Sequence, residues 1–168
     1  YTFFTCCIAT LAYLCMATDN GIYILPTGRE FFYARYVDWA LTTPLMLLEI
    51  CAIAKSTNDT KVWLVGTDFV MVLCGLIGAF YEDDIKYLYW TFGMAMFGPI
   101  LYFLFVGLKK NADAQNNSDV SALYYKVSWL TAIFWTGYPI MWWYCEGDGS
   151  FSVDTECLGY TILDVASK

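Results

Sequence analysis

Five long apolar stretches and one partial stretch constrain the fold of this chain more than any other feature of its sequence. Short polar segments separate them, and they cover residues 2–18, 31–54, 62–81, 85–108, 121–145 and 157–168. Each complete stretch is close to the roughly 20 residues that a helix needs to cross the hydrocarbon core of a bilayer. Only helices and closed barrels satisfy their backbone hydrogen bonds there, and these stretches do not alternate strictly as barrel strands do. We therefore predict an all-α membrane protein in which residues 1–168 form a single bundle domain.

Composition excludes several classes of function. Charged residues make up 15% of the chain and the net charge is −7, without the basic cluster that nucleic-acid binding requires. The sequence contains no histidine and no CxxC pair, which argues against histidine-based catalysis and against a zinc site, so we expect no metal. Five of the seven cysteines fall within apolar stretches and are interpreted as packing residues. Cys145 and Cys157 flank one loop, where their spacing allows a disulfide without requiring it.

The distribution of basic residues predicts the orientation of the bundle. Loops on the cytoplasmic side of membrane proteins are enriched in lysine and arginine. One side of the predicted bundle carries five lysines, whereas the other carries two basic residues among many acidic ones; the lysines are Lys55, Lys61, Lys109, Lys110 and Lys126, and the two basic residues are Arg29 and Lys86. We therefore expect the five-lysine side to face the cytoplasm.

Charged side chains within an apolar span are costly, so they normally face the bundle interior and mark an ion path or a bound ligand. This chain has six of them, namely Arg35, Asp38, Glu49, Asp68, Asp164 and Lys168. Asp38 and Glu49 are separated by about three helical turns, which returns them to nearly the same face about 16 Å apart. Arg35 lies one turn to the outer side of Asp38, and Thr42 lies one turn to the inner side. Ion pairs that merely hold helices together are the alternative interpretation.

Lys168 is the only amine that the sequence places far from both ends of the spans. Asp164 precedes it by one helical turn, so the two side chains share a face. An uncharged, buried lysine amine is suited to form a Schiff base with an aldehyde, and Asp38 and Asp164 are candidates for the counter-ion. Several aromatic residues fall in the middle of the spans, where they could enclose a long planar ligand or simply pack: Trp39, Trp90, Trp135, Tyr138 and Trp142.

Three motifs, in order along the chain, resemble those of microbial (type 1) rhodopsins. The segment RYVDWALTTPLMLLE at 35–49 resembles their third helix, WTGYP at 135–139 with Trp142 resembles the sixth, and LDVASK at 163–168 resembles the retinal-binding seventh. The resemblance implies a seven-transmembrane-helix bundle, of which this sequence contains helices B–F and the first half of G. Helix A and the end of helix G are expected to lie outside it.

The resemblance also implies roles for the charged residues within the spans. Lys168 is expected to carry all-trans retinal as a Schiff base, with Asp38 and Asp164 as counter-ion and Asp38 as the proton acceptor. Glu49 is expected to be the cytoplasmic proton donor. Arg35 is placed in the outward path and Thr42 beside the acceptor. The combination of Asp38, Thr42 and Glu49 is similar to that of proteorhodopsin- and xanthorhodopsin-type pumps.

Towards the outer side, the run SVDTE at 152–156 is more similar to fungal and other eukaryotic members of the family. Glu156 matches one member of an outer proton-release pair, and Glu146 matches the other across a one-residue gap. A solvated acidic loop is the alternative interpretation of these two residues.

The retinal pocket implied by the resemblance draws on the first five apolar stretches and lies beside Lys168 in the sixth. Met46 matches a colour-tuning position, and Asp68 matches a pocket residue that bonds across to the position of Thr43. The expected pocket consists of Tyr13, Trp39, Thr43, Met46, Met71, Gly75, Trp90, Gly93, Phe97, Trp135, Tyr138, Pro139 and Trp142.

From these features we predict a light-driven outward proton pump, which is a transporter and photoreceptor rather than an enzyme. Its expected partners are the lipid bilayer, the transported proton and further copies of itself as a homo-oligomer, in the plasma membrane or an internal membrane. A photosensor of the same fold is the main alternative, against which the acid Glu49 within an apolar span argues. A chloride pump would lack the carboxylate at position 38, and a sodium pump would carry different residues at positions 38, 42 and 49. A retinal-free structural bundle gives no reason for Lys168 beside Asp164.

Overall fold

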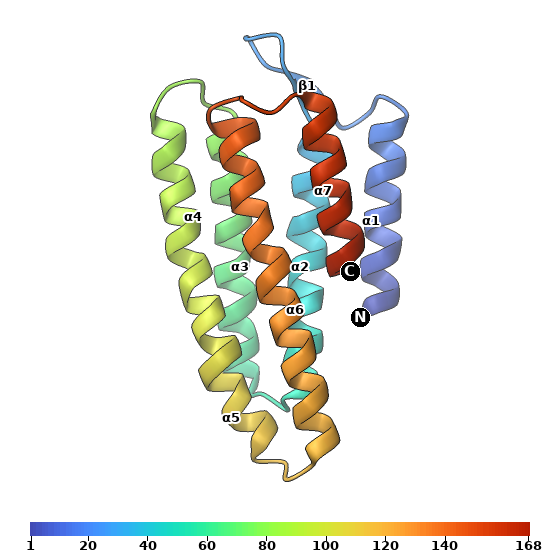
Figure 1. Cartoon of the computed structure of the whole chain (residues 1–168), viewed down its shortest axis with the longest axis vertical. Helices are drawn as coiled ribbons and strands as arrows, with labels where there is room; N and C mark the ends of the chain where they lie inside the picture. The colour runs from blue at the N-terminus through green and yellow to red at the C-terminus, as the bar shows by residue number, and fades with distance from the viewer.

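Helices form over every apolar stretch of the sequence, in a computed structural model that describes all of residues 1–168. The long helices run side by side and form one bundle (Figure 1). The α-helices are α1 (Thr2–Ala17), α2 (Tyr33–Ile53), α3 (Asn58–Ala79), α4 (Ile85–Tyr102), α5 (Leu108–Asp113), α6 (Ser118–Trp142) and α7 (Val153–Ser167). Two π-helical segments, η1 (Phe103–Gly107) and η2 (Trp143–Gly147), continue α4 into α5 and extend α6. The predicted helical bundle is confirmed.

Polar capping residues place three helix starts earlier than the apolar stretches suggest. The side chains of Thr57, Asn117 and Ser152 each accept a hydrogen bond from a backbone N–H in the first turn of the helix that follows. This pairing satisfies donors that the first turn would otherwise leave free. Helices α3, α6 and α7 therefore begin three to four residues before the predicted starts at positions 62, 121 and 157.

A short antiparallel hairpin connects α1 and α2, and the sequence patterns did not predict it. Strand β1 (Tyr23–Ile24) pairs with β2 (Glu30–Phe31), with Tyr23 opposite Phe31 and Ile24 opposite Glu30. Gly28 in the turn has a φ of 85°, a conformation that glycine adopts without strain. Phe31, which was assigned to the second apolar stretch, instead lies in β2 and is buried.

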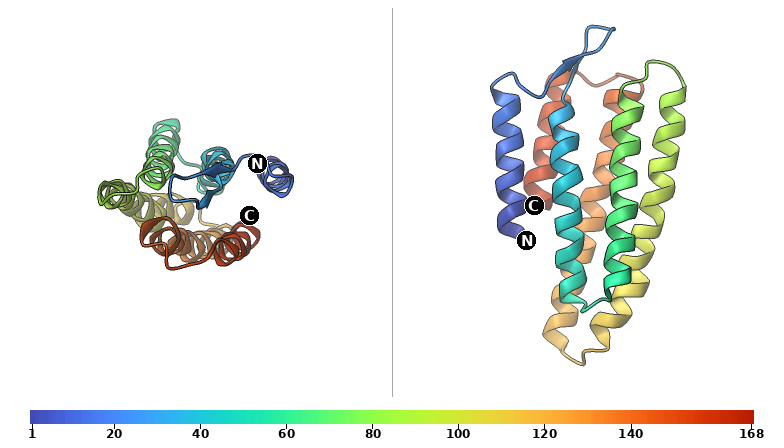
Figure 2. Two further views of the ribbon diagram at one scale, coloured as in Figure 1. Left: turned by 90° about the horizontal axis from the view of Figure 1, so that it is seen from above. Right: turned by 180° about the vertical axis from the view of Figure 1, so that it is seen from behind.

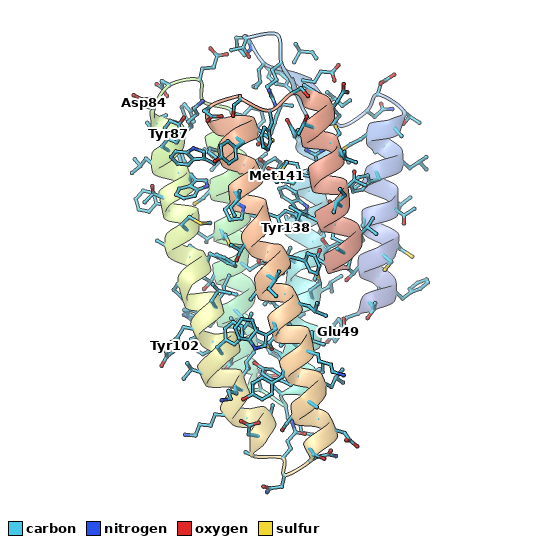
Figure 3. The ribbon with its side chains drawn as sticks, in the orientation of Figure 1. Glu49, Asp84, Tyr87, Tyr102, Tyr138 and Met141 are labelled. Carbon is cyan, nitrogen blue, oxygen red and sulfur yellow. The ribbon has the colours of Figure 1, made fainter.

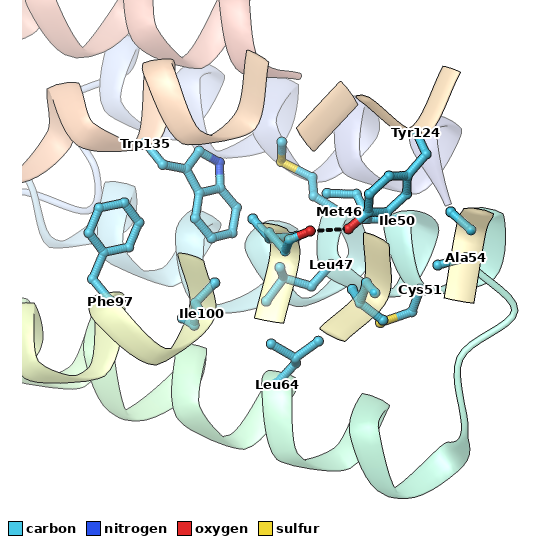
Figure 4. Close-up of a cluster of buried hydrophobic side chains, with 13 residues drawn as sticks. Met46, Leu47, Ile50, Cys51, Ala54, Leu64, Phe97, Ile100, Tyr124 and Trp135 are labelled. Carbon is cyan, nitrogen blue, oxygen red and sulfur yellow. Dashed lines mark hydrogen bonds between the residues drawn. The ribbon is translucent and has the colours of Figure 1, made fainter. Parts of the chain in front are cut away.

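The two ends of the bundle differ in charge and structure. The hairpin lies at one end, where α7 begins; the turn between α2 and α3 lies with α5 at the other (Figures 1 and 2). We call these the hairpin end and the lysine-rich end, because Lys55, Lys61, Lys109 and Lys110 belong to the second. Near the lysine-rich end, a buried cluster joins α2, α3, α4 and α6, and the Tyr124 hydroxyl donates to the Leu104 carbonyl (Figure 4).

Three helical segments are long and apolar enough to cross a membrane, namely Tyr33–Ile53, Asn58–Ala79 and Ile85–Asp113. Thr2–Ala17 is a shorter apolar helix. Large apolar side chains are exposed along the helices, including Phe3, Val62 and Val165 at 72%, 73% and 77%. Such faces suit contact with lipid rather than with water. All seven cysteines are free, so the disulfide considered between Cys145 and Cys157 is not formed.

Candidate functional site

An ion cluster at the centre of the bundle joins α2 to α7. The Lys168 amine is in contact with the Asp38 carboxylate and lies 3.0 Å from Oδ1 of Asp164. The side chains of Lys168, Asp38 and Asp164 are exposed by only 5%, 0% and 4%. The structure thus brings together the lysine and both acids that the sequence singled out.

Asp164 is held on several sides by neutral donors. The Tyr13 hydroxyl donates to its Oδ2 at 2.6 Å, while Trp39 Nε1 and the Tyr138 hydroxyl donate to its Oδ1 at 3.1 Å and 2.7 Å. These donors come from α1, α2 and α6, so three helices fix the position of this carboxylate on α7.

Asp38 has fewer partners than Asp164. Lys168 contacts its Oδ2, whereas its buried Oδ1 has no hydrogen-bond partner among the protein groups. The Thr42 hydroxyl donates to the backbone carbonyl of Asp38 at 2.8 Å and not to its carboxylate. Arg35, which was expected on the outward side of Asp38, pairs with Glu156 at 2.9 Å.

An apolar cavity begins beside this ion cluster. It is lined from α2, α3, α4, α6 and α7 by Tyr36, Trp39, Thr43, Met71, Val72, Gly75, Trp90, Gly93, Met94, Phe97, Trp135, Tyr138, Pro139, Trp142 and Tyr160. The indole N–H groups of Trp90 and Trp142 donate to backbone carbonyls at 3.1 Å, so their polar atoms are satisfied within the wall. Trp39 and Tyr138 line the cavity and also donate to Asp164, which connects the apolar space to the ionic centre.

Eleven of the thirteen predicted pocket residues line this cavity, and Tyr13 and Met46 do not. Tyr13 instead binds Asp164, and Met46 lines a second hollow. The Thr43 hydroxyl donates to Oδ2 of Asp68 at 2.7 Å, the bond across α2 and α3 that the resemblance implied. Asp68 is fully buried, so this hydroxyl is an important partner for its carboxyl group.

The second hollow lies towards the lysine-rich end and contains Glu49. It is lined by Thr2, Thr5, Met46, Glu49, Ile50, Val127, Leu130, Thr131, Ala166, Ser167 and Lys168. The Thr2 hydroxyl donates to Glu49 at 2.7 Å. Figure 3 shows Glu49 nearer to the lysine-rich end than Tyr138, whose hydroxyl donates to Asp164 of the ion cluster. Glu49 and Lys168 therefore border one space, with Asp38 on the other side of Lys168.

Glu156 and Glu146 form a network at the hairpin end. Glu156 is 1% exposed and pairs with Arg35 at 2.9 Å and with Arg29 at 2.7 Å. Glu146 accepts hydrogen bonds from the hydroxyls of Tyr36 at 2.8 Å and Tyr160 at 3.3 Å. The alternative of a merely solvated acidic loop is therefore wrong for these two residues.

Comparison with known proteins agrees with this geometry. The family model described as bacteriorhodopsin-like protein matches residues 1–168. The chain belongs to this family. It is 36% identical to archaerhodopsin-2 of Halobacterium sp. (strain aus-2) and 35% identical to the opsin-like protein carO of Fusarium fujikuroi, over 96% of its own length in each case. The crystal structure of the light-driven proton pump rhodopsin of Coccomyxa subellipsoidea superposes with a TM-score of 0.94 at 36% identity, over 98% of this chain and 74% of that one.

Membership of the bacteriorhodopsin-like family confirms several of the sequence-based predictions. The family has the seven-helix membrane fold, and its members are multi-pass membrane proteins whose characteristic chromophore is retinal. The chain spans 64% of the length of archaerhodopsin-2 and 56% of carO. What a complete protein transports, and through which residues, is therefore a matter for proposal.

Sequence reasoning missed four cavity residues, namely Tyr36, Val72, Met94 and Tyr160. Two of them carried a detectable signal. Tyr160 precedes Asp164 by four residues and Tyr36 precedes Trp39 by three, spacings that put each on the same helix face as a residue already singled out. Val72 and Met94 directly follow predicted pocket residues, and only the rotation of α3 and α4 in the bundle brings them to the cavity.

Proposed function

We propose that this rhodopsin is a light-driven pump that moves protons outward, with all-trans retinal bound through Lys168 as a protonated Schiff base. The observation that carries the proposal is the contact of the Lys168 amine with Asp38 and Asp164 at the end of an apolar, aromatic cavity. An elongated apolar aldehyde fits these residues, because the cavity walls present apolar faces and the ionic cluster stands at one end. Retinal supplies light absorption and a change of shape that moves the bonded nitrogen.

On the outward side, Asp38 is the proposed acceptor and, with Asp164, the counter-ion. Asp38 contacts the Lys168 nitrogen directly and has one oxygen without a protein partner, which is available for a proton. Asp164 is fixed by its three donors and is the proposed second carboxylate of the counter-ion. Arg35, Glu156 and Glu146 continue from this centre to the hairpin end and form the proposed exit.

On the inward side, Glu49 is the proposed donor. It lies on the same helix as Asp38, nearer to the lysine-rich end, and borders the hollow that also contains Lys168. Thr2 holds its carboxyl group through a hydrogen bond from α1. A proton passed to Asp38 and replaced from Glu49 has moved from the lysine-rich end towards the hairpin end. The basic residues at the lysine-rich end support an inward-facing assignment of that end. Assembly into a homo-oligomer stays a prediction.

Light-driven acidification tests this proposal. Cells that express the full-length gene with retinal are illuminated with green light while the pH of an unbuffered suspension is followed, with and without a protonophore. Acidification that the protonophore abolishes is the expected result, and Asp38→Asn should remove it. Asp148→Asn, which neutralises an exposed acid at the hairpin end, should pump normally. A visible retinal band without any pH change would refute the pump and favour a photosensor.

A further inference from the structure

Arg29 connects the hairpin to α7 through two polar contacts. Its Nη1 donates to the Phe151 carbonyl at 2.9 Å, and its Nη2 pairs with Oε2 of Glu156 at 2.7 Å. The Leu25 amide in turn donates to the Arg29 carbonyl at 2.9 Å, so the residue is fixed at both its backbone and its side chain. The hairpin therefore lies tethered over the end of the bundle where α7 begins (Figures 1 and 2).

Glu156 consequently has two guanidinium partners, one on each oxygen. Arg35 binds Oε1, is 1% exposed and lies against the ring of Tyr160, 4.5 Å from its centroid. Arg29 binds Oε2, and its side chain is 21% exposed. The carboxylate of Glu146, the other acid of this network, accepts hydrogen bonds from the hydroxyls of Tyr36 and Tyr160, whereas Lys86 donates to its backbone carbonyl at 3.2 Å. The two acids thus differ in the charge of their partners.

We propose that Arg29 is a positioning residue for proton release, which keeps Glu156 paired as a carboxylate whenever Arg35 moves away from it. This inference rests on the proposed pump. A buried carboxylate that loses its only cation becomes unfavourable and takes up a proton. While Arg29 remains paired with Glu156, Arg35 can move towards or away from Asp38 when the charge of Asp38 changes, and Glu156 stays charged. Under this arrangement, the proton that leaves the protein comes from the part of the network around Glu146.

Several other titratable or charged groups lie near Glu156, and they also influence the pH at which it takes up a proton. Besides Arg29, they are Arg35 and Tyr36 from α2, Cys145 and Glu146 from η2, and Cys157 from α7 itself. Arg29 is the one cation among them that the hairpin contributes. Substitution of Arg29 therefore removes one of the two cations paired with Glu156, together with the contact to the Phe151 carbonyl, and keeps Arg35 as the other cation.

The test uses the full-length protein with retinal and the variants Arg29→Gln and Arg29→Lys. Glu30→Gln is the control, because it changes the charge of the same hairpin by one unit at an exposed side chain that does not contact Glu156 or Glu146. A pH-indicating dye in the medium follows proton release after a flash. In Arg29→Gln we expect release to be about tenfold slower, and the pH at which fast release falls to half to rise by about one unit. Arg29→Lys keeps the charge and should restore the pH profile, although it loses the two-pronged contact.

A second readout does not depend on pumping. In the dark, the infrared band of a protonated carboxyl, assigned through Glu156→Gln, should appear at higher pH in Arg29→Gln than in the unsubstituted protein. Unchanged release kinetics together with an unchanged band would overturn the inference, as would a change of equal size in Glu30→Gln, which would trace the effect to the net charge of the hairpin. Absence of light-driven acidification in the unsubstituted protein would refute the pump instead, and the dark band would still decide whether Arg29 keeps Glu156 charged.

Discussion

Removal of the central cation should destabilise the protein because it leaves two carboxylates buried without their ion pair. Lys168→Met is the relevant change, studied in the retinal-free, full-length protein. At the 3.0 Å separation of Lys168 and Asp164, Coulomb's law with an effective dielectric constant of about 20 gives about 5 kcal/mol. Measured losses for breaking a buried ion pair are about 3–5 kcal/mol. We therefore expect Lys168→Met to lower the free energy of unfolding by about 4 kcal/mol.

Most of the lost stability should come from the Asp38 carboxylate, because Lys168 is the group that contacts it. Asp164 keeps three neutral hydrogen-bond donors when Lys168 is replaced. In the Lys168→Met background, Asp38→Asn should recover about 2 kcal/mol relative to the sum of the two single changes. Unfolding by a denaturing detergent in mixed micelles measures all four proteins of the cycle. Asp68→Asn is the control, because Asp68 bonds to Thr43 and contacts neither partner. Additivity of Lys168→Met and Asp38→Asn within about 0.5 kcal/mol would refute the reasoning.

Three further changes test the packing and a buried hydroxyl. Gly78→Ala should lower the free energy of unfolding by about 1–3 kcal/mol, because the new Cβ would lie 3.1 Å from the Trp142 and Tyr89 side chains and 3.2 Å from the Lys86 carbonyl. In Gly66→Ala the new Cβ would meet no neighbouring side chain within 4 Å. This change should instead stabilise α3 by about 0.5–1 kcal/mol, measured by the same unfolding in mixed micelles. Thr5→Val should raise the unfolding free energy by about 1 kcal/mol, since the buried Thr5 hydroxyl has no hydrogen-bond partner. A loss of stability in Thr5→Val would show that this hydroxyl is satisfied.

The helices and the ion cluster could be predicted from the sequence because both follow from local spacing. Apolar runs of about 20 residues specify membrane helices almost regardless of their surroundings. The four-residue spacing of Asp164 and Lys168 fixes their common face, and the cost of a buried charge then requires a partner such as Asp38. The structure brings these three residues together as expected.

The hairpin and its contacts could not be predicted in the same way. Strands of two residues have no periodicity to detect, and their pairing is specified by the turn between them. The contact of Arg29 with Glu156 joins residues 127 positions apart, so it depends on how α7 packs beside the hairpin. Thr42 was expected beside Asp38, and spacing alone did not show which Asp38 atom it contacts; within the helix its hydroxyl donates to the Asp38 backbone carbonyl, four residues earlier.

A direction of transport requires that a proton cannot return by the route on which it left. The contacts around Lys168 have the necessary asymmetry. Asp38 contacts the Lys168 amine. The proposed exit path runs from Asp38 towards the hairpin end, where Arg35 pairs with Glu156. Glu49 does not touch Lys168 and is separated from it by the hollow that both border. A movement of the nitrogen away from Asp38 and towards this hollow would break the first connection while it makes the second. Two carboxyls at equal distances from Lys168 would not impose that order.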